Sequence, residues 1–146
     1  MAGRLLVVDD DAALRRVLEV NLAARGYEVD LAATGELALG LARRRPDLIV
    51  LDLVLPDMDG LEIISYVRTF SDVAIVVISA REAEQATADA LSAGADDYVL
   101  KPFGIDDLVA RIEAALSRPA AQARRPGPPA AGDKPLRGGW RMMRQR

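Results

Sequence analysis

The stretch Leu48-Ile49-Val50-Leu51-Asp52 decides the fold class of this chain, because a fully apolar run ends abruptly at a carboxylate. An uninterrupted short run of apolar residues is typical of a strand that is buried on both faces. Pro46 stops the helical pattern before it, and the segment Pro56-Asp57-Met58-Asp59-Gly60 after it is rich in turn residues. The stretch therefore predicts a strand inside a parallel sheet.

The same unit, a short apolar run followed by a helical pattern, occurs five times before about residue 117. We expect strands at 5–8, 27–31, 48–51, 73–78 and 97–100, and helices at 12–25, 34–45, 61–67, 82–93 and 105–116. Strands that alternate with helices form parallel sheets covered on both sides. The sequence thus predicts an α/β fold with a five-stranded parallel sheet, doubly wound by five helices.

The composition changes near residue 118. Residues 1–117 hold 11 basic and 21 acidic residues, a net charge of −10, whereas residues 118–146 hold eight basic residues and one acidic residue, a net charge of +7. Segment 119–146 is rich in Ala, Pro, Gly and Arg, which predicts a linker or a disordered basic tail. We expect one domain over 1–118, too acidic to bind nucleic acid by itself, and a tail over 119–146.

Several classes of chemistry are excluded by composition. The chain has no cysteine and no histidine, so disulfides, Cys-ligated zinc and a histidine base are ruled out. Catalysis would have to use carboxylates, hydroxyls and lysine. The longest apolar runs are far shorter than the roughly 20 residues of a membrane-spanning helix. We therefore expect a cytoplasmic protein without a membrane segment.

Polar or charged residues stand at the carboxyl ends of four of the five expected strands. Asp9 and Asp10 follow the first strand, Asp52 the third, Ser79 the fourth and Lys101 the fifth. Sheets of this kind bind ligands at that edge. The sequence therefore predicts that these five side chains converge on one site.

These residue types suit phosphoryl transfer assisted by Mg²⁺. Clustered carboxylates need a compensating cation, and Mg²⁺ prefers oxygen ligands. A carboxylate can attack phosphorus to give an acyl phosphate, while a lysine and a hydroxyl stabilise the phosphoryl group. Singly, each residue has a plainer explanation: Asp11 as a helix cap or a solvated loop residue, Asp52 as a cap, Ser79 as part of a turn. Their combination at four strand ends favours the chemical explanation.

The order and spacing of these residues resemble the receiver domains of two-component response regulators. The matching stretches are 5–11, 46–60, 75–80 and 94–103, and the resemblance covers about residues 4–117. It implies that the chain is a signalling switch that takes a phosphoryl group from a sensor histidine kinase. It also implies that the chain catalyses only its own phosphorylation and dephosphorylation and is not a conventional enzyme.

The resemblance also implies roles for individual residues. Asp52 is the phosphoacceptor, and Asp9, Asp10, Asp52 and the backbone carbonyl of Val54 hold Mg²⁺ or Mn²⁺. The residues implied to bind the phosphoryl group or to relay its presence, with the candidate cis-proline, are Ser79, Lys101, Tyr98 and Pro102.

A finer similarity is to receivers of the winged-helix transcription factors of the OmpR class, carried by residues 95–98 and 101–103. Residues 101–105 look most like regulators of Kdp potassium transport. Receivers of this class dimerise on phosphorylation through the last strand and its flanking helices, and Asp97 and Arg111 match one of the charge pairs used there. Thr87 departs from the pattern, since the class usually has a basic residue near this position.

Members of this class continue into a DNA-binding domain, which would be the route to DNA and to transcription control. The 29 residues after Ser117 read as linker instead. The sequence thus predicts either a truncated regulator or a stand-alone receiver with a basic tail.

Two other functions are compatible with parts of the pattern. Asp9-Asp10-Asp11 and residues 57–60 superficially resemble the aspartyl nucleophile motif of haloacid-dehalogenase phosphatases, but Pro56 stands where that motif needs its strand. The other alternative is an interaction module, a receiver fold with an inactive site. Turnover of a small phosphate ester would identify a phosphatase, and phosphorylation by a small phosphodonor would separate a working receiver from an inactive one.

Overall fold

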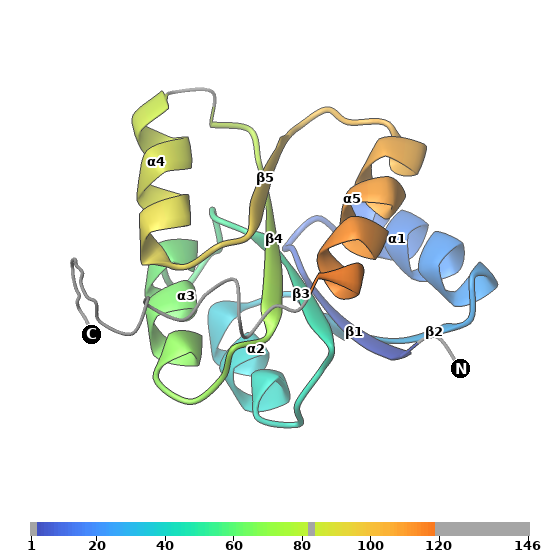
Figure 1. Ribbon diagram of the computed structural model, residues 1–146, viewed down its shortest axis with the longest axis horizontal. Helices are drawn as coiled ribbons and strands as arrows, with labels where there is room; N and C mark the ends of the chain where they lie inside the picture. Colours follow the sequence, from blue (N-terminus) through green and yellow to red (C-terminus); the bar gives the residue numbers. More distant parts are fainter. Residues whose placement is uncertain (1–2, 82–83, 119–146) are drawn as a thin grey trace.

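The computed structural model describes residues 3–81 and 84–118, which form five strands and five helices in strict alternation (Figure 1). The strands are β1 (Gly3–Val8), β2 (Tyr27–Ala32), β3 (Leu48–Asp52), β4 (Ala74–Ser79) and β5 (Asp97–Leu100). The helices are α1 (Ala12–Ala24), α2 (Gly35–Ala42), α3 (Gly60–Arg68), α4 (Glu84–Ala93) and α5 (Ile105–Ser117). The predicted α/β fold is confirmed, while the predicted tail lies outside the described residues.

The sheet is parallel throughout, with the strand order β2-β1-β3-β4-β5. The chain passes outward from β1 to β2 and then crosses back to β3, so β1 and β3 become neighbours in the middle of the sheet. Val8 is in register with Leu51. The residues that follow them, Asp9 and Asp52, are therefore level with each other at the switch in strand order where such sheets bind ligands.

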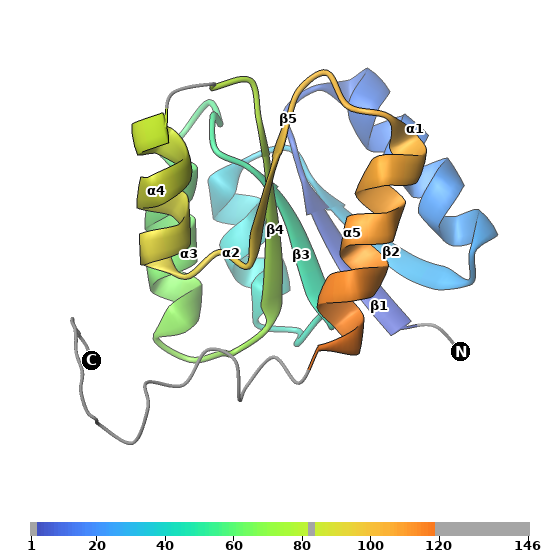
Figure 2. The same cartoon turned by 45° about the horizontal axis from the view of Figure 1, so that its top comes forward.

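Helices cover both faces of the sheet, with α1 and α5 on one face and α2, α3 and α4 on the other (Figure 2). Alternate residues of β1 point to opposite faces. Leu5 and Val7 pack in the cluster of α1 and α5, and Leu6 and Val8 pack in the cluster of the other three helices. Burial on both faces explains why these strands are apolar without interruption.

Local signals account for the start of three helices. The carboxylate of Asp11 accepts hydrogen bonds from the first turn of α1, and Thr34 and Asp59 do the same for α2 and α3. Asp11 is thus a helix cap, the plainer of the explanations considered for it.

Three element boundaries differ from the sequence expectation. Helix α2 ends at Ala42, because the next residues turn and Arg45 has a φ of 59° before Pro46, which disfavours a helical conformation in the preceding residue. Strand β4 runs one residue further than expected and includes Ser79. Helix α4 begins at Glu84 within the described residues.

Across 3–81 and 84–118, the longest helices have 13 residues. No helix in these ranges has both the length and the apolar character needed to cross a membrane.

Candidate functional site

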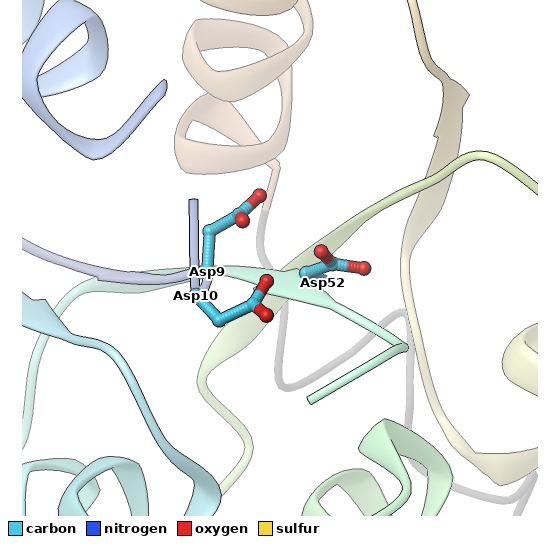
Figure 3. A group of neighbouring side chains, drawn as sticks. All are labelled: Asp9, Asp10 and Asp52. Atoms are coloured by element: carbon cyan, nitrogen blue, oxygen red, sulfur yellow. The ribbon is translucent and has the colours of Figure 1, made fainter. Parts of the chain in front are cut away.

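Three carboxylates meet at the carboxyl edge of the central strands. Asp9 and Asp10 follow β1 and Asp52 ends β3, and one oxygen of each lies within 4.8 Å of the others (Figure 3). Asp9 and Asp52 are buried, at 0% and 4% exposure, whereas Asp10 is exposed. The structure thus confirms that strand ends far apart in the sequence bring these three acidic groups together.

Lys101 bridges two of the three carboxylates. Its Nζ donates a hydrogen bond to Asp9 Oδ2 and another to Asp52 Oδ2, each at 2.9 Å. The backbone at Lys101 continues the sheet, since its amide donates to the Ser79 carbonyl at 2.8 Å. Lys101 therefore enters the site from the end of β5 and supplies the positive charge that two buried carboxylates need.

Burial and charge act on Asp52 in opposite directions. Burial raises the pKa of Asp52 above its ordinary value, and the negative charge of Asp9 raises it further, while the hydrogen bonds from the Val54 amide and Lys101 oppose this rise. Desolvation works to lower the pKa of Lys101, but the hydrogen bonds and charges of Asp9 and Asp52 outweigh it, so this pKa is raised. The ammonium group therefore stays charged at neutral pH.

The loop after β3 returns its backbone to Asp52. Asp52 Oδ1 accepts a hydrogen bond from the Val54 amide at 3.0 Å, and Val54 pairs with Asp59 in a short antiparallel bridge. Gly60 allows this close approach, because a Cβ there would lie 2.6 Å from the Cα of Leu53. The structure thus places the backbone of Val54 directly beside the acidic group.

Ser79 and Tyr98 are linked through one residue of the loop after β4. Ser79 is fully buried, and its Oγ accepts a hydrogen bond from the Arg81 amide at 3.1 Å. The Tyr98 hydroxyl donates to the Arg81 carbonyl at 2.9 Å. Arg81 was not singled out from the sequence, because it acts through its backbone and a backbone contact leaves no mark in the choice of residue.

Asp97 and Arg111 form an ion pair on a different part of the molecule. Nη1 of Arg111 donates to both carboxylate oxygens of Asp97, at 2.9 and 3.1 Å, and its Nε lies 3.4 Å from Asp107 Oδ2. Asp97 begins β5, whereas Lys101 follows its end, so the pair is not part of the acidic site. The peptide bond between Lys101 and Pro102 is cis.

Two further residues hold the loops of the site and were not predicted. Arg15, on α1, donates from Nη1 to the Asp9 carbonyl at 2.8 Å. The carboxylate of Asp57 accepts hydrogen bonds from the amides of Gly35 and Glu36. Both were ordinary polar positions in the sequence, a helix surface and a turn, and only the approach of distant segments gives them a role.

The donor set fits a divalent cation. All three side chains offer carboxylate oxygens, the ligands that Mg²⁺ prefers, and the exposure of Asp10 leaves room for the water molecules that Mg²⁺ retains. Three carboxylates and one ammonium carry a net charge of −2, which one divalent ion would balance. The acidic group has the character of a receiver Mg²⁺ site.

With this geometry in view, the family is clear: the chain matches the response regulator receiver domain over residues 5–113 and belongs to that family. Family membership makes it a signalling switch of a two-component system rather than a conventional enzyme, and this decides against the phosphatase alternative.

Individual relatives refine the comparison. The chain is similar to the transcriptional regulatory protein KdpE of Mycobacterium tuberculosis, with 45% identity over 120 residues, covering 82% of this chain and 53% of KdpE. It is 47% identical over 120 residues to the response regulator MprA of Mycobacterium sp. (strain KMS), covering 81% and 52%. A two-component response regulator from Clostridium difficile has a similar structure, with a TM-score of 0.76 and 32% identity, covering 79% of this chain and 96% of that one.

These similarities confirm the predicted resemblance to receivers of the OmpR class. The chain spans about half the length of KdpE and MprA, and the matched part is the receiver.

Proposed function

We propose that Asp52 accepts a phosphoryl group from a sensor histidine kinase with the help of Mg²⁺ or Mn²⁺. The observation that carries this proposal is the buried carboxylate of Asp52, 2.9 Å from Lys101 Nζ and grouped with Asp9 and Asp10. A buried acidic group with a raised pKa, a fixed lysine and two further carboxylates is an arrangement typical of functional sites.

The residues divide the work of phosphoryl transfer. An oxygen of Asp52 attacks the phosphorus atom and forms the acyl phosphate, while the bond between phosphorus and the donor group breaks. Lys101 can exchange its contact with Asp52 for the incoming phosphoryl oxygens. Asp9, Asp10, Asp52 and the Val54 carbonyl would hold the metal, which neutralises charge on the phosphoryl oxygens when bound.

The new charge would be read by Ser79 and Tyr98. We expect the Ser79 hydroxyl to leave the Arg81 amide and donate to the phosphoryl group, because a charged acceptor makes a stronger hydrogen bond. Tyr98 holds the same residue by its carbonyl, so the two contacts change together. Phosphorylation then acts as a shift between two packings of the loop after β4.

The output would be a homodimer formed through α4, β5 and α5. Leu91 and Leu100 on this face are 46% and 42% exposed, and Arg111 and Asp97 supply charge beside them. A groove on the same face is lined by residues that include Thr87, Tyr98 and Phe103.

By similarity to KdpE, the wider role is control of transcription in the cytoplasm. The receiver unit would be residues 1–118, followed by the predicted tail, and DNA would be contacted only through an output domain outside this chain.

Intact mass spectrometry tests the acceptor. The native chain, Asp52→Asn and the exposed control Asp106→Asn are incubated with acetyl phosphate and Mg²⁺, with and without EDTA. The proposal predicts one added phosphoryl group in the native chain and the control, and none in Asp52→Asn or in EDTA. No gain with either metal would show that the site is inactive, the interaction-module alternative. For the dimer, sedimentation of the phosphorylated chain and of Arg111→Glu should show association that the charge reversal abolishes.

A further inference from the structure

We propose that Asp57 is a positioning residue of the metal site, whose carboxylate fastens the loop after β3 to α2 and so holds the Val54 carbonyl in place for Mg²⁺. This inference deepens the proposed function and rests on it. Asp57 would not bind the metal itself but would act through the backbone of the loop, residues 53–59.

Asp57 receives two backbone hydrogen bonds, one on each carboxylate oxygen. Oδ1 accepts from the Gly35 amide at 2.7 Å, and Oδ2 accepts from the Glu36 amide at 2.9 Å. These amides belong to the first turn of an eight-residue helix, where backbone donors have no partner inside the helix. The same two contacts lower the pKa of Asp57, so the carboxylate is ionised and accepts both at neutral pH.

The near end of the loop is tied to the site itself. The Val54 amide donates to Asp52 Oδ1 at 3.0 Å, and Val54 pairs with Asp59 in the antiparallel bridge. Residues 55–58 lie between the two sides of this bridge, outside the sheet. Asp57 connects this outer part of the loop to a second element, which the bridge alone does not do.

Helix α2 is a firm anchor for that connection. Ala38 and Ala42 are 1% and 4% exposed and pack in the core, and the Thr34 hydroxyl caps the helix through the Leu37 amide at 3.2 Å. Met58, next to Asp57, lies so close to Gly35 that a Cβ there would come within 2.3 Å of Met58 Cγ. The loop tip is therefore seated on the helix by both packing and hydrogen bonds.

The position of a backbone ligand depends on how firmly its loop is held. A carbonyl that must be ordered before it can bind contributes less to affinity than one already in place. Residues that orient metal ligands typically change metal affinity by about tenfold or more when they are removed. Loss of the Asp57 contacts should therefore weaken Mg²⁺ binding while Asp9, Asp10 and Asp52 are unchanged.

Isothermal titration of Mg²⁺ into the unphosphorylated protein tests this directly. The variants are Asp57→Ala, which removes both acceptors, and Asp57→Asn, which keeps one acceptor oxygen. The matched control is Glu36→Gln, which removes one negative charge from the same turn of α2 and leaves both amide donors. Hydrogen exchange of the Gly35 and Glu36 amides without metal reports whether the contacts to Asp57 have opened, and circular dichroism checks the fold.

The proposal predicts a Kd for Mg²⁺ raised about tenfold in Asp57→Ala, less in Asp57→Asn and hardly at all in Glu36→Gln, with faster amide exchange in the two Asp57 variants. A Kd in Asp57→Ala equal to that of Glu36→Gln would overturn it, whether or not the amides exchange faster. If Asp57→Ala does not fold, the comparison of Asp57→Asn with Glu36→Gln decides the question in the same way. A native chain that binds no Mg²⁺ would instead overturn the metal site itself, and this inference with it.

Discussion

The hydroxyl of Tyr98 donates a hydrogen bond to the backbone carbonyl of Arg81, with 2.9 Å between the two oxygens. The amide of the same residue donates to Ser79 Oγ at 3.1 Å. One residue of the loop after β4 therefore holds both a buried hydroxyl at the acidic site and an aromatic ring on the face of α4, β5 and α5. A change at the site has a short physical route to that face.

Removing the Tyr98 hydroxyl should separate phosphorylation from its effect. Tyr98→Phe leaves the acidic site intact, so we expect acetyl phosphate to modify it at the native rate. The phosphorylated dimer should be weaker by about fivefold, the equivalent of one hydrogen bond worth about 1 kcal/mol. Sedimentation before and after phosphorylation measures this, with Tyr66→Phe as the control on α3. Equal dimerisation of the Tyr98 variant and the native chain would show that the contact with Arg81 carries no signal.

Asp52→Asn should make the protein more stable at neutral pH. The folded-state pKa of Asp52 is raised by burial, so its protonated form suits the fold and this stability is lost as the pH rises through that pKa. An uncharged amide avoids the loss, and we expect a gain on the order of 1 kcal/mol at pH 7, shrinking below pH 4. Thermal unfolding across this range measures it, and Asp106→Asn should show no such pH-dependent gain.

Lys101→Met should leave two buried carboxylates without their shared ammonium group. Asp9 and Asp52 would then repel each other, and removing one partner of a buried ion pair costs roughly 3 kcal/mol or more. Mg²⁺ supplies the missing charge, so it should raise the melting temperature of this variant more than that of the native chain. Calorimetry in EDTA and in excess Mg²⁺ checks both effects, and an equal response to Mg²⁺ would contradict the electrostatic role of Lys101.

Two glycines make a matched pair for the loop after β3. Gly60→Ala would place a methyl group 2.6 Å from the backbone of Leu53, and such overpacking typically costs about 1–3 kcal/mol. Gly40→Ala adds a methyl group where no other atom lies within 4 Å, in the interior of α2, and should stabilise by about 0.5–1 kcal/mol. Urea unfolding of both variants measures the difference, and a harmless Gly60→Ala would mean that the loop can move away from Asp52.

Much of the molecule could be predicted from local patterns. The uninterrupted apolar run at 48–51 indicated a strand buried on both faces, and its alternation with helical patterns indicated a parallel sheet. Because parallel strands share one direction, the polar residues after them had to reach the same edge. Asp9, Asp10, Asp52 and Lys101 were therefore predictable as neighbours before any contact was known.

What the sequence by itself determined is thus the class of fold and the chemical types gathered at one edge, since apolar periodicity and chain direction are local properties. The tertiary structure decided the contacts: Lys101 with Asp9 across 92 residues, Tyr98 with Arg81 across 17, and Asp57 with Gly35 across 22. Such contacts depend on strand register and on where loops return. Two of them use backbone atoms that every residue carries, so no side-chain pattern could announce them.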